Sequence, residues 1–194
     1  TLALPALPAG VLTPERPAEP VPDALLRLVP QPESWQATGG TANLTTLQCS
    51  HPALARINDL TARLSLPDLL ADGGALVVVH PADLPDEAYQ LTLTTTGVQI
   101  AAGSDHGLFN AAMTLLALRE TYAGAVPCGV IRDAPRFGYR GQHLDCARHF
   151  FAVPTILRLL DLMALVKLNR FHWHFADDEA FRLQVDCIPD LWRK

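Results

Sequence analysis

The order strand, helix, strand over residues 129–177 is the feature that most constrains the fold of this chain. "VIRDAPRFGYRGQHLDCAR" is predicted to hold one strand with its approach, and "RFHWHFA" a second. Between them, "VPTILRLLDLMALVKLN" is predicted to be a helix, with Pro154 in its first turn and Asn169 at its end. Its apolar positions recur at helical spacing: Ile156, Leu159, Leu160, Met163 and Val166. Strand, helix and strand within about 40 residues form a βαβ unit, with parallel strands and a right-handed crossover.

The segment before this unit has a different pattern. Short strands are predicted in "LLRLVPQPESW" and "ALVVVH", and an amphipathic helix in "HPALARINDLTARLS". "AYQLTLTTTGVQIAA" alternates apolar and polar residues up to a turn at Gly97, as a hairpin does. "SDHGLFNAAMTLLALRE" is predicted to be a second helix, capped by Ser104 or Asp105. We therefore expect residues 25–128 to form an α+β domain, an antiparallel sheet with two helices on one side.

Residues 1–24 are rich in proline, which disfavours both helix and sheet. We interpret them as a linker or extended lead-in. The chain begins at Thr1 and shows no basic segment followed by an apolar one, so its compartment (secreted, periplasmic or cytoplasmic) stays open.

Charge and cysteine spacing argue against several classes of partner. The net charge is −5 and no run of Lys or Arg is present, so a nucleic acid is not expected as a partner. No apolar stretch approaches the roughly 20 residues of a membrane span. The four cysteines include no C-x-x-C pair, which argues against a zinc knuckle, and we expect reduced, mostly buried thiols. The sequence leaves the oligomeric state open.

Two histidines mark the second strand of the βαβ unit. The strand period places His172 and His174 on one face of "HWHFADD". Such a pair could ligate a metal, although catalytic zinc usually takes three protein ligands and the rest would have to come from elsewhere. The alternative is a pair of hydrogen-bonded histidines inside a packed barrel.

Polar side chains follow both strands of the unit. Functional groups of parallel α/β folds lie at the carboxyl ends of strands, so Arg148 and Asp177 are expected at one rim. A guanidinium donor and a carboxylate acceptor facing one pocket suit a polyhydroxylated ligand. The alternative is an ion pair that only holds the rim together. Asp178 follows Asp177 directly, and strand alternation directs the two side chains to different sides.

Residues 132–191 resemble the opening of the catalytic barrel of family 20 glycoside hydrolases, the β-N-acetylhexosaminidases. That family's pattern is close to D-x-P-R-F-x-x-R-G-x-x-L-D-x-A-R-H-F, then a helix and K-x-N-x-x-H-W-H-x-x-D-D-Q-G-W-R. The preceding segment is similar to the accessory domain of the same family, notably in "DEAYQLTL" and "GLFNAAMTLLAL". The resemblance implies an α+β accessory domain followed, in residues 129–194, by the first βαβ unit of a (β/α)8 TIM barrel.

The resemblance also implies roles for individual residues. Arg148 matches the arginine that holds the 3- and 4-hydroxyls of a terminal N-acetylhexosamine, and Asp177 an aspartate of the network around the catalytic acid. Asp178 is expected to support the loop, and His172 and His174 to be barrel residues, because the family uses neither metal nor cofactor. Arg140, near the start of its strand, is expected to be structural. The chain departs from the pattern in "DDEAFR", where the family has Gln-Gly-Trp.

The family's chemistry rests on an adjacent Asp-Glu pair at the end of the fourth barrel strand. The glutamate protonates the leaving oxygen, while the aspartate orients the substrate's 2-acetamido group, which attacks the anomeric carbon. Residues 135–194 are a fraction of the about 250 residues of a complete barrel, so we expect this pair downstream and predict that the chain alone is inactive. The alternatives are a non-catalytic module that binds carbohydrate or a partner, and a metal-dependent barrel hydrolase.

Overall fold

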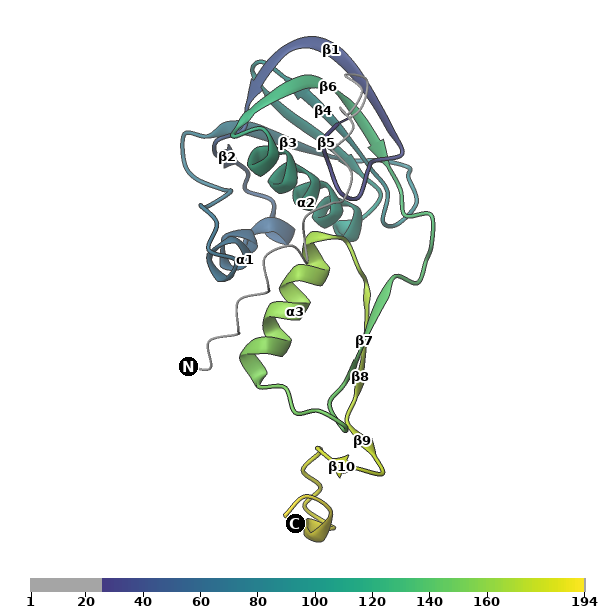
Figure 1. The fold of residues 1–194 in the computed structure, drawn as a ribbon. Coiled ribbons are helices and arrows are strands. Elements are labelled where there is room, and N and C mark those ends of the chain that lie inside the picture. The colour runs from purple at the N-terminus through teal and green to yellow at the C-terminus, as the bar shows by residue number, and fades with distance from the viewer. Residues whose placement is uncertain (1–25, 194) are drawn as a thin grey trace, which may run out of the picture.

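A computed structural model describes residues 26–193. Segment 1–24, predicted to be a linker, lies outside the described residues. Most of the described chain up to Asp133 forms a six-stranded sheet with helices on one face, and the remainder forms a strand, helix, strand unit beside it (Figure 1). The expected α+β domain followed by the start of a barrel is confirmed.

The sheet has the strand order β1-β6-β4-β5-β3-β2. Its strands are β1 (Ser34–Asn43), β2 (Leu47–Gln48), β3 (Ala75–Pro81), β4 (Tyr89–Thr94), β5 (Gly97–Ala102) and β6 (Ala125–Asp133). A 3₁₀ turn (Pro52–Leu54), α1 (Ile57–Arg63) and α2 (Asp105–Thr121) accompany them. Figure 1 shows both helices on the same side of the sheet. The core lies between α2 and the sheet and includes Leu91, Leu93, Ile100, Leu108, Leu115 and Leu118.

The helix α2 begins where its capping residue predicts. The Ser104 hydroxyl accepts hydrogen bonds from the backbone N–H groups of His106 (3.0 Å) and Gly107 (3.4 Å). Those N–H groups have no partner within the helix, so the cap stabilises the first turn. Ser104 is therefore the N-cap of the two candidates.

The expectation of a purely antiparallel sheet is wrong at one edge. β4 and β5 form the predicted antiparallel hairpin, but β3 pairs with β5 in parallel, from Leu76↔Gly97 to Pro81↔Ala102. β2 also pairs with β3 in parallel. The reason is the path of the chain: the segment after β3 crosses the end of β5 to reach β4, and the hairpin then inserts β5 between β3 and β4.

Two local predictions near the N-terminus also change. The strand predicted in "LLRLVPQPESW" is absent among the described residues 26–33, and β1 begins only at Ser34. Pro30 and Pro32 carry no N–H for a ladder, which explains the late start. The helix predicted in "HPALARINDLTARLS" is split into the 3₁₀ turn and α1.

The boundary expected between residues 128 and 129 falls inside β6. This strand pairs with β1 on one side and with β4 on the other, up to Asp133. A strand that is hydrogen-bonded along both edges belongs to its sheet as a whole. The accessory sheet therefore continues to Asp133.

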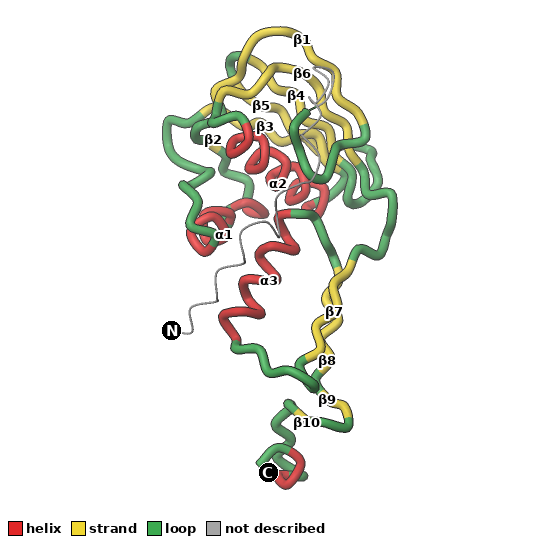
Figure 2. The backbone as a smooth tube through the Cα atoms, in the orientation of Figure 1, coloured by secondary structure: helices red, strands yellow, loops and turns green. Residues whose placement is uncertain are grey.

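The βαβ unit consists of β7 (Gly141–Asp145), α3 (Val153–Leu165) and β8 (Arg170–His174). β7 and β8 are parallel, as predicted, with the register Gly141↔Arg170 to Asp145↔His174. The chain then forms the small antiparallel pair β9 (Ala176–Asp177) and β10 (Ala180–Phe181), and loops with a 3₁₀ turn at Pro189–Leu191 follow (Figure 2).

The apolar stripe of α3 is only partly covered. Ile156 and Met163 are buried, whereas Leu160 and Val166 are exposed. The helix ends at Leu165, before the predicted Asn169, because Lys167 adopts a positive φ of 60°. Such a backbone conformation cannot continue a right-handed helix.

The cysteines are free thiols, with Cys128 and Cys146 buried and Cys187 exposed. The helices within residues 26–193 are all too short or too polar to span a membrane.

Candidate active site

The carboxyl ends of β7 and β8 bring Arg148 and Asp177 together. Asp145 and His174 are partners in the parallel register, so the two strands end side by side. Arg148 lies three residues past the end of β7, and Asp177 three residues past the end of β8. The Arg148 Nη2 lies 2.6 Å from the Asp177 Oδ2. We call Asp145, Arg148, His174, Asp177 and Glu179 the rim cluster.

Arg148 contacts three carboxylates at once. Besides Asp177, its Nη1 donates to Asp145 Oδ2 (2.7 Å) and its Nε donates to Glu179 Oε2 (3.1 Å). The side chain remains about half exposed, at 49%. Each of the three guanidinium nitrogens is thus paired with a different acid, while about half of the side chain stays accessible to solvent.

The charges of the rim cluster stabilise one another. Hydrogen bonds from the Arg148 side chain, and then from the backbone N–H groups of Arg148 and Ala147, lower the pKa of Asp145 to about 2. The pKa of Asp177 is lowered by the backbone N–H of Asp178 and by His174, with a further contribution from Arg148. The same acids, Asp145 first, raise the pKa of Arg148. Asp145, Arg148 and Asp177 are therefore all ionised at neutral pH.

His174 and Asp178 lie on either side of Asp177. The His174 Nε2 is 3.0 Å from the Asp177 Oδ2, and the backbone N–H of Asp178 donates to Oδ1 at 2.8 Å. Asp178 is exposed and holds Asp177 through its backbone. Asp177 is thus fixed from three directions, by a ring nitrogen, a guanidinium and a main-chain amide.

Sequence reasoning missed two members of the rim cluster, Asp145 and Glu179. Asp145 ends β7 and lies three residues before Arg148, a spacing that already placed both at the same strand end. Glu179 lies in the segment that departs from the family pattern. It reaches Arg148 because β9 and β10 fold back on each other, a turn that no periodicity signals.

A third histidine joins the predicted pair. His143 lies opposite His172 in the strand register, and the candidate ligand atoms of His143, His172 and His174 all lie within 4.8 Å of one another. Three imidazoles on one face of the β7–β8 ribbon are the group of described residues best able to hold a metal ion.

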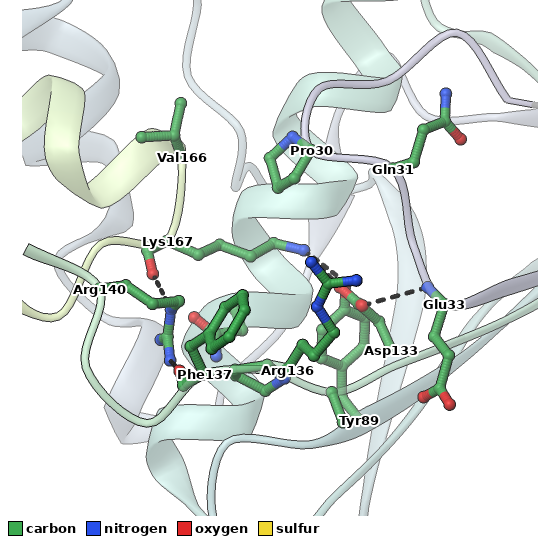
Figure 3. Close-up of a pocket in the computed structure, with 13 residues that line it drawn as sticks. Pro30, Gln31, Glu33, Tyr89, Asp133, Arg136, Phe137, Arg140, Val166 and Lys167 are labelled. Atoms are coloured by element: carbon green, nitrogen blue, oxygen red, sulfur yellow. Dashed lines mark hydrogen bonds and ion pairs between the residues drawn. The ribbon is translucent and has the colours of Figure 1, made fainter.

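A cavity of about 650 Å³ lies between the accessory sheet and the segments that lead into β7 and β8 (Figure 3). The Lys167 Nζ donates hydrogen bonds to Tyr89 Oη and to Asp133 Oδ2, both at 2.7 Å. Burial lowers the pKa of Lys167 and raises that of Tyr89, and the Asp133 charge raises the Tyr89 pKa further. This network joins the end of α3 to β4 and β6.

Arg140 completes this junction. Its Nη1 lies 3.1 Å from Glu87 Oε2, its Nη2 2.5 Å from Oε1, and its Nε donates to the Lys167 carbonyl at 2.9 Å. In parallel α/β barrels the amino ends of the strands contribute stability and the carboxyl ends carry function. The cavity therefore lies at the structural end of the unit, and the rim cluster lies at the functional end.

Comparison with known families matches nearly the whole described chain. Residues 25–134 match the model for glycosyl hydrolase family 20, domain 2, and residues 137–194 match the model for glycosyl hydrolase family 20, catalytic domain. The junction between the two matches follows the end of β6 at Asp133.

Relatives agree with this assignment. A β-hexosaminidase of Vibrio furnissii is 34% identical over 95% of this chain, and a β-N-acetylhexosaminidase of Cellulomonas fimi is 34% identical over 86%. The structure of a Vibrio harveyi GH20 exo-β-N-acetylglucosaminidase in complex with N-acetylglucosamine has a TM-score of 0.72 at 31% identity, covering 92% of this chain and 30% of that one. This chain spans 32% and 38% of the first two relatives. The chain therefore belongs to glycosyl hydrolase family 20, and covers its domain 2 and the start of its catalytic domain.

Proposed function

We propose that this chain is the N-terminal part of a β-N-acetylhexosaminidase, and that its rim cluster binds the terminal sugar of the substrate. The whole protein would remove terminal β-linked N-acetylglucosamine or N-acetylgalactosamine from oligosaccharides such as chitin fragments. The proposal rests on the ion pair between Arg148 and Asp177 at the carboxyl ends of two parallel strands. The Arg148 Nη2 lies 2.6 Å from the Asp177 Oδ2. Relatives named N,N'-diacetylchitobiase and β-hexosaminidase support the substrate class.

The geometry suggests how the rim would hold a sugar. Two neighbouring sugar hydroxyls offer two acceptor oxygens, and each can accept a hydrogen bond from one of the guanidinium N–H groups. Asp145 accepts a hydrogen bond from Arg148 and holds it in place, so the guanidinium is oriented before a ligand arrives. Orientation in advance reduces the entropy lost on binding.

Asp177 would act as a positioning residue. Its bonds with His174 and with the Asp178 N–H fix the carboxylate, which in turn faces Arg148. In the proposed reaction the 2-acetamido oxygen of the substrate attacks the anomeric carbon, and a glutamate from the fourth barrel strand protonates the leaving oxygen. This substrate-assisted route is a known exception to the two-carboxylate mechanism. The described residues supply the binding and positioning part of it.

The binding role is tested by titrating the chain with methyl N-acetyl-β-glucosaminide while observing the Arg148 Nε–H signal by NMR. We expect a saturable shift with this sugar and none with its 3,4-dideoxy analogue. Arg148→Ala should abolish the binding, whereas Arg158→Ala, on the exposed side of α3, should not change it. Equal binding of both sugars would contradict the role of Arg148.

The catalytic part of the proposal needs a second measurement. The coding sequence that follows Lys194 is expected to supply an adjacent Asp-Glu pair, and the 194-residue chain alone should not hydrolyse an aryl N-acetyl-β-glucosaminide. Turnover by the chain alone would contradict the predicted inactivity. A coding sequence without the pair, combined with sugar binding, would favour a carbohydrate-binding module.

A further inference from the structure

Glu179 brings a third carboxylate to Arg148 from the turn of the β9–β10 hairpin. Asp177 pairs with Ala180 in the strand register, so Asp178 and Glu179 form the turn between them. The Glu179 Oε2 accepts a hydrogen bond from the Arg148 Nε at 3.1 Å. Glu179 stands where the family pattern has a glutamine, and the proposed function gives it no role of its own.

The Nε–H of Arg148 is the donor that fixes how the guanidinium is turned. Nε carries a single hydrogen, whereas the two Nη nitrogens carry two each. Asp145 lies 2.7 Å from Nη1 and Asp177 lies 2.6 Å from Nη2, so each Nη group keeps a hydrogen for a further acceptor. The single hydrogen of Nε is directed at Glu179. Because all five N–H groups lie in one plane, an acceptor on Nε sets the direction of the others.

We propose that Glu179 is a positioning residue of the sugar site: by accepting the Nε–H of Arg148, it directs the remaining Nη hydrogens toward the hydroxyls of the terminal sugar. The inference rests on the proposed function, since it needs Arg148 to be the residue that holds the sugar. Asp145 acts on Nη1 from the end of β7, and Glu179 acts on Nε from the hairpin. A guanidinium fixed by two elements loses less rotational freedom when a ligand arrives.

The hairpin that carries Glu179 is anchored independently of this contact. The Arg182 N–H donates to the Phe175 carbonyl at 3.0 Å, which continues the pairing of β9 with β10. The Arg182 Nε donates to the Cys146 carbonyl at 3.0 Å, and the Cys146 N–H donates to the His174 carbonyl at 2.9 Å. Glu179 is therefore not needed to hold the hairpin in place. A half-exposed ion pair also adds little stability, so its effect is expected in the orientation of the guanidinium.

The role is tested on the 194-residue chain by observing the Arg148 Nε–H in ¹⁵N NMR, first without ligand and then during titration with methyl N-acetyl-β-glucosaminide. In Glu179→Ala, we expect the Nε–H to exchange faster with water and the sugar affinity to fall about 2- to 5-fold. Glu179→Gln keeps an acceptor oxygen at the same reach, so the exchange and the affinity should stay close to those of the parent. Glu179→Asp keeps the charge but is one methylene shorter, so it should behave like Glu179→Ala.

The matched control is Asp186→Asn, which removes a negative charge from an exposed residue after β10. It should leave the Nε–H exchange and the sugar affinity unchanged. Unchanged Nε–H exchange in Glu179→Ala, or parent-like sugar affinity in Glu179→Asp, would overturn the role of Glu179. Absence of sugar binding by the parent chain would instead contradict the proposed function, while the Nε–H exchange in the ligand-free variants would still show whether Glu179 holds Arg148.

Discussion

Arg63 on α1 and Asp161 on α3 form a two-pronged ion pair that joins the accessory domain to the βαβ unit. Arg63 Nη2 lies 2.8 Å from Asp161 Oδ1, and Nε lies 2.9 Å from Oδ2. Asp161 is only 9% exposed although it carries a charge, and Arg63 approaches it from the solvent side. The paired geometry satisfies a carboxylate that would otherwise be costly to bury.

A double-mutant cycle on Arg63→Ala and Asp161→Asn should give a coupling energy of about 1 kcal/mol in urea unfolding, because the pair is bidentate and one partner is buried. The control is the exposed ion pair between Arg56, which precedes α1, and Asp59 in its first turn. The Arg56 side chain is 88% exposed. Its coupling should stay within about 0.5 kcal/mol. Equal coupling energies in the two cycles would show that the junction is not held by this contact.

Tyr89 should make the chain lose stability at alkaline pH. Burial and the Asp133 charge raise its pKa above the ordinary value of 10.0, so the unfolded chain releases the proton first. The stabilising contribution is therefore complete below pH 10 and decreases as the pH rises above it. The free energy of unfolding should fall more steeply between pH 10 and 12 in the parent than in Tyr89→Phe.

This difference is measured by urea unfolding at several pH values, with Tyr139→Phe, an exposed tyrosine, as the control. At neutral pH, Tyr89→Phe should itself cost about 1–3 kcal/mol, since Lys167, Asp133 and Thr114 lose a hydrogen-bond partner. Parallel pH profiles for the parent and Tyr89→Phe would argue against the assigned burial.

Removing Arg148 should raise the pKa of Asp145. That pKa is about 2, against an ordinary 3.8, mainly because of the Arg148 side chain. A lowered carboxyl pKa contributes stability that is present above 3.8 and is lost as the pH falls toward 2. In Arg148→Ala, we expect the Asp145 carboxyl to titrate closer to 3.8 by NMR, and stability to depend less on pH in this window.

The control for the Asp145 titration is Arg158→Ala, which removes one positive charge from α3 away from the rim cluster. It should leave the Asp145 titration in place. An unchanged Asp145 pKa in Arg148→Ala would mean that the backbone N–H groups of Ala147 and Arg148 alone hold the carboxylate.

Gly129 on β6 should tolerate no side chain. A Cβ atom there would lie 2.3 Å from the Trp35 ring and 2.4 Å from the Gln36 carbonyl oxygen on the neighbouring β1. Gly129→Ala must displace that strand or the indole, and it should cost about 2 kcal/mol or more in thermal or urea unfolding. Gly138→Ala is the matched control, because nothing lies within 4 Å of its Cβ position, and it should change stability by less than about 1 kcal/mol. A similarly small loss of stability in both variants would indicate that β1 can shift to make room for the added methyl group.

The sequence by itself determined those helices and turns that are stabilised by contacts between residues close together in the chain. The Ser104 cap, the hairpin around Gly97 and the helix after Pro154 all follow from periodicity and capping within a few turns. The approach of Arg148 to Asp177 also followed, because a parallel pair of strands places its carboxyl ends together.

Only the tertiary structure decided which distant segments pair. The insertion of β5 next to β3, the contact of Arg63 with Asp161, and the addition of His143 to His172 and His174 each join segments far apart in sequence. The period of apolar residues predicts which face of a strand is buried. It does not predict which strand lies beside it or in what register they pair. The rim cluster and the group of His143, His172 and His174 are complete only once that register is set.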